Sequence, residues 1–106
     1  MNKFIGKWRI TEMELWDQDF VDAEVPGYIS FTENNQGEFQ FGYVHGYMDC
    51  RYSNKKGKET VEFSWEGNDE MDPASGRGIA HIEKSNLVGE LFFHDGDDSG
   101  FKAIKN

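Results

Sequence analysis

Apolar and polar residues alternate along most of this chain of 106 residues, and turn-forming residues interrupt the alternation at intervals. Apolar residues occupy every second position at Phe39, Phe41 and Tyr43, and the segment 61–65 shows the same alternation. A period of two, broken about every 8–12 positions, is typical of an all-β protein. The pattern predicts strands at residues 7–15, 27–32, 38–43, 46–53, 59–66, 78–84, 87–94 and 100–104.

The segments between these strands have the composition of turns and loops. Residues 34–37, 54–57 and 84–86 contain Asn, Gly or Ser, which suit tight hairpin turns because Gly and Asn tolerate positive φ angles. Residues 16–26 and 67–77 are richer in Pro, Asp and Gly and are predicted to be longer loops, the first with room for one short helical turn. Consecutive strands are therefore expected to be antiparallel neighbours.

Antiparallel strands in a single small domain must protect the two edges of their sheet. Closure into a barrel removes both edges. A chain of this length has room for one hydrophobic core, and no linker or repeat divides it. We therefore expect one domain over residues 1–106, an eight-stranded, antiparallel, up-and-down β-barrel.

The start of the first predicted strand carries Gly6, Lys7 and Trp8. This triplet resembles the Gly-x-Trp signature of the calycin group, the lipocalin, fatty-acid-binding and avidin-like barrels. The resemblance implies a lipocalin-like barrel in which Trp8 plugs a closed end and a basic residue late in the last strand, here Lys102, packs over the indole. Segments 41–46 and 63–73 also resemble a group of small, uncharacterised bacterial proteins, a likeness that brings no function with it.

Acidic residues outnumber basic ones by 20 to 11, which gives a net charge of −9. This balance argues against nucleic acid as a partner, because binding to phosphates requires clustered Lys and Arg. Ten of the acids lie in segments 17–24, 69–72 and 95–98, none of which contains Lys or Arg. In a meander these segments and a tight turn at Val44 and His45 open at the same end of the barrel. Lysines gather near the turns of the other end.

We interpret this acidic end as the mouth of a ligand site. Carboxylates beside aromatic faces form a favourable environment for an organic cation. The expected ligand is a small cationic or amphipathic molecule, with aromatic residues at the entrance and Arg77 bracing the acidic loops. The alternative is that the aromatic residues only cap the core and the acids only keep the surface soluble. The candidate ligand-binding residues are Trp16, His45, Tyr47, Trp65, Glu66, Asp69, Glu70, Asp72, Arg77 and His94.

The segment from Asp95 to Gly100 contains the candidate metal ligands Asp95, Asp97 and Asp98. Its first half matches a calcium loop, but Asn106 stands where an EF-hand needs a bidentate Glu, so an EF-hand is excluded. A different calcium or magnesium site would need carboxylates from segment 69–72. The alternative is a hairpin turn with hydrated carboxylates. A zinc-type site would use His45 and His94 with a carboxylate.

The competing function is protein binding. A compact acidic protein can dock on the basic surface of a partner and inhibit it, with its carboxylates on a continuous outer face. A ligand carrier should instead have an open cavity lined with aromatic residues. No Ser-His-Asp order, nucleophile elbow or phosphate loop is present, so catalysis is not expected.

The single cysteine and the lack of long apolar segments indicate a cytoplasmic protein. Cys50 is the single cysteine and is expected to be a buried thiol, so no internal disulfide can form. The N-terminal segment lacks the apolar core of a signal peptide, and no apolar run reaches the length of about 18 residues that would cross a bilayer.

Overall fold

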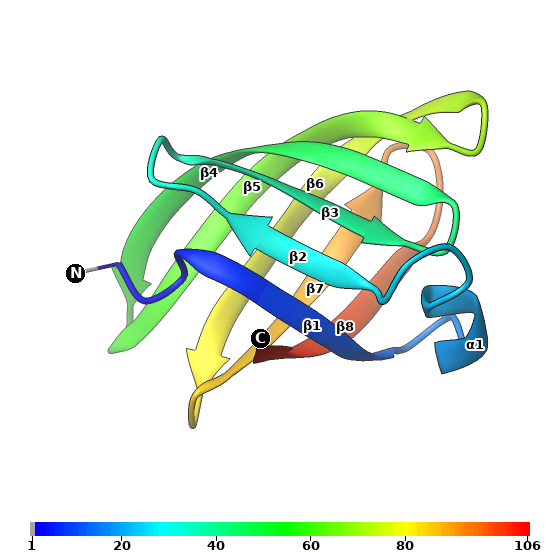
Figure 1. Cartoon of the computed structure of the whole chain (residues 1–106). Coiled ribbons are helices and arrows are strands. Elements are labelled where there is room, and N and C mark those ends of the chain that lie inside the picture. Colours follow the sequence, from blue (N-terminus) through cyan, green and yellow to red (C-terminus); the bar gives the residue numbers. More distant parts are fainter. Residues whose placement is uncertain (1) are drawn as a thin grey trace.

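The computed structural model describes residues 2–106 as one closed barrel (Figure 1). One short helix, α1 (Gln18–Val21), lies between the first two strands. The all-β class and the eight-stranded antiparallel barrel predicted from the sequence are confirmed. The strands are β1 (Gly6–Met13), β2 (Tyr28–Phe31), β3 (Gln36–Phe41), β4 (Val44–Lys55), β5 (Lys58–Asp69), β6 (Asp72–Glu83), β7 (Asn86–Phe93) and β8 (Asp98–Lys105).

Each strand pairs with the next in sequence, and β8 closes the barrel against β1. In the closing pair Trp8 lies opposite Lys105 and Met13 lies opposite Phe101, with a register shift between Ile10 and Glu12. An irregularity of this kind adds local twist and bends a strand, which suits the β1 and β8 seam of a closed barrel.

The central hairpins are longer than the sequence predicted. Segment 67–77 was expected to be a loop, but it forms the ends of β5 and β6, joined by a two-residue turn at Glu70 and Met71. Pro73 is paired with Asn68 near the hairpin end, and its fixed φ angle is compatible with an extended backbone. The prediction failed because Pro and Gly content was interpreted as a break in the strand.

A second difference concerns the turn between β3 and β4. The sequence suggested a turn at Val44 and His45, but both residues already belong to β4, and the chain turns at Gly42 and Tyr43. Gly42 has a φ of +56°, which glycine adopts without steric cost. The turn takes Tyr43 out of the alternation, so its side chain is exposed while Phe39 and Phe41 are buried.

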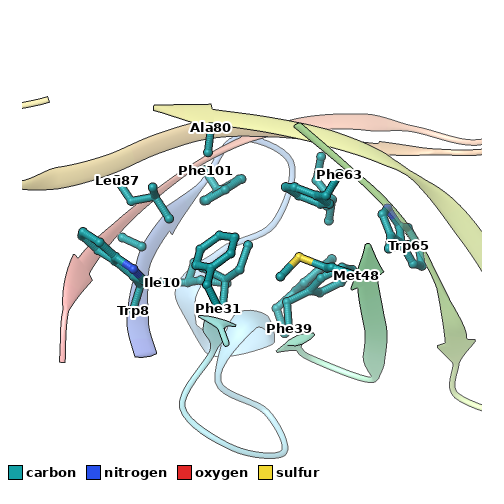
Figure 2. Close-up of a cluster of buried hydrophobic side chains, with 14 of the residues drawn as sticks. Trp8, Ile10, Phe31, Phe39, Met48, Phe63, Trp65, Ala80, Leu87 and Phe101 are labelled. Carbon is teal, nitrogen blue, oxygen red and sulfur yellow. The ribbon is translucent and has the colours of Figure 1, made fainter. Parts of the chain in front are cut away.

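Buried side chains fill the interior of the barrel. Figure 2 shows aromatic and aliphatic side chains from opposite strands converging on the axis, among them Phe31, Phe39, Met48 and Phe63. All of these are almost completely buried, as is the thiol of Cys50. The strand alternation therefore supplies a packed core.

The end that carries the N-terminus is closed by aromatic packing. Phe4 contacts Phe31 and Tyr52, and the indole Nε1 of Trp8 donates a hydrogen bond to the Phe4 carbonyl at 2.9 Å. The cation over Trp8 is Lys105, whose Nζ lies 4.6 Å from the ring centroid, and not Lys102. Strand alternation explains the correction, because Lys102 points outward from β8 between the buried residues 101 and 103.

Candidate functional site

The fold brings the three acidic segments to one end of the barrel, as the sequence predicted. This end holds α1 and the β3–β4, β5–β6 and β7–β8 turns, on the right in Figure 1. Two of the turns are joined directly, because the Glu70 amide donates a hydrogen bond to the Tyr43 carbonyl at 2.9 Å. We call this region the acidic end.

The first acidic segment has a structural role. Both carboxylate oxygens of Asp22 accept hydrogen bonds from Arg9, at 2.8 and 2.7 Å, and one also accepts from the Gly27 amide. The hydrogen bond from Arg9 is the main reason that the pKa of Asp22 falls to about 2. Asp17 caps α1 by accepting from the Phe20 amide. These two carboxylates therefore hold the loop in place.

The second acidic segment is the tip of the β5–β6 hairpin, formed by Asp69, Glu70, Met71 and Asp72. Glu70 has a φ of +56°, a left-handed conformation that is unfavourable for a residue other than glycine. Met71 is 94% exposed. Three acidic residues of the tip thus flank in sequence an apolar side chain that is almost completely exposed.

The third acidic segment forms the β7–β8 turn. Asp95 has a φ of +57°, and the Gly96 amide donates to the Phe93 carbonyl at 3.0 Å, as in a hairpin turn. The exposed His94 lies 3.4 Å from Asp95. Within residues 2–106 no three His, Cys, Asp or Glu side chains are grouped as a metal site would require. Metal binding by Asp95, Asp97 and Asp98 stays a prediction.

The aromatic residues expected at an open entrance instead pack over the end of the barrel. The ring of Trp16 lies 5.0 Å from that of Phe41 and 6.1 Å from that of Phe20. Trp65 is only 3% exposed and contacts Phe93, with the ring centroids 5.1 Å apart. Together these rings cover the core beneath α1.

The other candidate residues lie on the outer wall. Tyr47 and Glu66 are paired across β4 and β5 and are exposed. Arg77 stands on the outer side of β6 opposite Ser64, and no ion pair within residues 2–106 joins it to the acidic loops. Because side chains alternate between the two sides of a strand, these residues cannot line the interior that holds Trp65.

His45 takes part in a polar network that the sequence did not reveal. Its Nε2 lies 3.0 Å from Glu38 Oε2, and the Tyr28 hydroxyl donates to the same oxygen at 2.9 Å. The hydrogen bonds with His45 and Tyr28 lower the pKa of Glu38, while burial raises the pKa of Tyr28 to about 12. The network joins β2, β3 and β4 on the outer wall, and only the strand register places its members side by side.

Exposed apolar side chains are the feature of the acidic end that sequence reasoning missed. Leu15 is 48% exposed and Tyr43 is 44% exposed, in addition to Met71. Tyr43 is held by an edge-to-face contact with Phe20, with the ring centroids 6.0 Å apart. The position of Met71 between acidic residues was the available signal, because an apolar residue in a polar turn has no core to enter.

Comparisons of the chain with protein-family models, with curated proteins and with solved structures found no match. Within the described residues, no helix is long and apolar enough to cross a membrane.

Proposed function

We propose that the protein is a binding module whose acidic end docks on a basic, partly apolar surface of a partner protein. Met71 carries the proposal, because it is 94% exposed at a hairpin tip and lies between Glu70 and Asp72. An apolar side chain surrounded by charge is typical of an interface that combines an apolar anchor with a polar rim.

The distribution of ion pairs supports a basic partner. The ion pairs within residues 2–106 leave Asp69, Glu70, Asp72, Asp97 and Asp98 unpaired. At the opposite end, lysines pair with glutamates, as in Lys55 with Glu62 at 2.8 Å. No cation among the described residues neutralises these five carboxylates of the acidic end, so their negative electrostatic field accelerates encounter with a positive surface.

The apolar side chains of this end supply buried area on docking. Tyr43 is fixed by Phe20, and its backbone is joined to the β5–β6 turn through the Glu70 amide. A fixed aromatic ring loses little conformational freedom when a partner covers it. Met71 is flexible and can adapt its shape to the partner.

A small cationic or amphipathic ligand inside the barrel is less well supported. The axis is filled by buried side chains, and Trp16 and Phe20 cover the core at the acidic end. Such a ligand would have to displace this cover. A divalent cation bound by the β7–β8 turn would have to gather ligands from a neighbouring turn.

We also propose that the protein is related to the calycin barrels and that it is located in the cytoplasm. The barrel topology and the position of Trp8 beneath Lys105 at the N-terminal end support the first. The single, fully buried thiol of Cys50 suits the second, because burial raises its pKa to about 11 and leaves it unreactive.

Site-specific photo-crosslinking tests the proposal. A photoreactive side chain replaces Met71 in one variant and Lys56, at the tip of the opposite β4–β5 hairpin, in another, and both are irradiated in extract of the producing cell. We expect position 71 to capture a basic protein that position 56 does not, and we expect this capture to disappear as salt rises from about 50 to 500 mM. Equal capture at both positions, or capture that salt does not weaken, contradicts docking through the acidic end.

A further inference from the structure

A second candidate site lies on the outer wall of the barrel, away from the acidic end. A hollow of about 400 Å³ crosses β4, β5, β6 and β7. The strand register places Asp49, Ser64, Arg77 and Phe92 in one line across these four strands. Ser64 has the shortest side chain of the line, so the hollow opens above it between Asp49 and Arg77.

Arg77 is the unusual residue of this hollow. Within residues 2–106 its guanidinium has no carboxylate at ion-pair distance, although acidic residues are in large excess. The neighbouring Glu62 is paired with Lys55 at 2.8 Å, and Asp49 is paired with Arg51 at 2.6 Å. The two carboxylates that line the hollow are therefore already in ion pairs, and the planar donor set of Arg77 is available to an external acceptor.

The walls beside Arg77 are apolar. Phe92 lies opposite Arg77 on β7, and Ile79 follows on the same side of β6. Both are half-buried, so each presents part of its apolar surface to the hollow. A guanidinium next to an aromatic ring and an aliphatic side chain suits an anion with an apolar body.

The charge of the surroundings favours an anion with a single charge over a dianion. Asp49 and Glu62 line the hollow with Arg51 and Arg77, so these four side chains carry no net charge. The whole chain carries −9. A dianionic phosphate would be repelled by the protein field more strongly than a carboxylate, because the repulsion scales with the charge.

We infer that this hollow binds a monocarboxylate with an apolar body, with Arg77 pairing to the carboxylate and Phe92 contacting the body. The inference is independent of the proposed docking function, because Arg77 and Phe92 lie on the wall and not at the acidic end. The same chemistry exists in a free organic acid and in the C-terminal carboxylate of a peptide.

The inference is tested by titrating 3-phenylpropionate into the protein. Binding is followed through the NMR signals of the Arg77 Nε–H group and of the amides around Ser64 and Phe92. The comparison probes are the neutral 3-phenylpropionamide and phenylphosphonate, with all titrations made at a pH above the second pKa of phenylphosphonate so that it is a dianion. We expect the carboxylate to move these signals in a saturable way and to bind more tightly than either comparison probe. Acetyl-Gly-Gly-Phe with a free or an amidated C-terminus then distinguishes a peptide source from a free acid.

Two variants and one control complete the test. Arg77→Gln removes the guanidinium and should weaken binding about tenfold or more. Ser64→Trp fills the hollow from an exposed position while Arg77 stays in place, and should weaken binding by at least as much. Lys102→Gln removes one positive charge from the outer side of β8 and should leave the affinity within about twofold. Equal effects of Arg77→Gln and Lys102→Gln, or tighter binding of the amide or phosphonate, would overturn the inference.

Discussion

At the scale of single residues, the acidic side chains divide into those that hold the fold and those that are free to act. Asp22 is hydrogen-bonded to Arg9, Gln18 and Gly27, whereas Asp97 makes no ion pair within the described chain. The sequence shows all of these residues as equivalent members of acidic loops. The structural role of Asp22 depends on its contact with Arg9, 13 positions away, and that of Asp17 on its cap of α1.

Replacing Asp22 with Asn should destabilise the protein in a pH-dependent way. The folded pKa of about 2 lies below the ordinary value of 3.8, so the stabilisation is complete above about pH 4 and is lost as the pH falls through 2. Because the pair is about a third exposed, we expect a loss of about 1–2 kcal/mol at neutral pH. Urea unfolding at pH 7 and pH 3 measures it. Asp97→Asn is the control, and an equal loss there contradicts the assignment.

Lys105 and Lys102 provide a second test at this scale. Lys105 Nζ lies over Trp8 and donates a hydrogen bond to the Ile5 carbonyl at 2.6 Å, whereas Lys102 is exposed. Lys105→Met, which keeps most of the stem, should cost about 1 kcal/mol of unfolding free energy. Lys102→Met should change it by less than about 0.5 kcal/mol. The opposite order in thermal or urea unfolding would restore the role that the calycin resemblance gave to Lys102.

At the scale of elements, strand alternation and turn chemistry were sufficient to predict eight strands, because both signals are local. The closure of the barrel followed from the need to protect the two edges of the sheet. The extension of β5 and β6 through segment 67–77 was missed, since strand pairing there overrides the preference of Pro73 and Gly76 for loops. The cover formed by Trp16 and Phe20 agrees with the alternative drawn from the sequence, in which these aromatic residues cap the core, but its arrangement was not predicted. Its geometry depends on how the loop that contains α1 folds back over Phe41 and Phe93.

The β5–β6 turn is expected to be strained at Glu70. Glu70→Gly should stabilise the protein by about 0.5–1 kcal/mol, because glycine adopts the positive φ angle without steric cost. Met71→Gly, at the next position of the same turn, should destabilise the protein by a similar amount. Glycine there relieves no strain in the folded protein and only adds conformational freedom to the unfolded chain. Thermal unfolding of the two variants checks this contrast, and a stability of Glu70→Gly at or below that of Met71→Gly would contradict the strain.

At the scale of the whole molecule, the barrel separates its charge into two unequal ends. Lys3, Lys55 and Lys58 of the N-terminal end are paired with glutamates, as in Lys3 with Glu59 at 3.5 Å, while the carboxylates of the β5–β6 tip face each other without cations. The sequence predicted the separation, because meander topology assigns alternate turns to opposite ends. It could not predict the exposed Tyr43 among the acids, since the exposure of Tyr43 depends on where the β3–β4 turn falls.

Neutralising the tip should therefore increase stability. The triple variant Asp69→Asn, Glu70→Gln and Asp72→Asn removes repulsion between unpaired carboxylates and should gain about 0.5–1 kcal/mol at low ionic strength. The gain should fade as salt is raised to about 1 M, where charges are screened over roughly 3 Å. Urea unfolding at the two salt concentrations measures it. A loss of stability would indicate that these carboxylates have a structural role, as Asp22 does.

The affinity of the same triple variant for the basic partner captured at position 71 tests the central claim most directly. Calorimetric titration compares it with the unmodified protein and with a variant in which Lys55, Lys56 and Lys58 at the opposite end are replaced by Gln. If the protein docks through the acidic end, the acidic variant should bind about tenfold or more weakly than the unmodified protein, although it is the more stable of the two. The lysine variant should bind at least as well as the unmodified protein. The proposed function would be contradicted if the acidic variant kept its affinity and the lysine variant lost affinity instead, because the interface would then lie elsewhere.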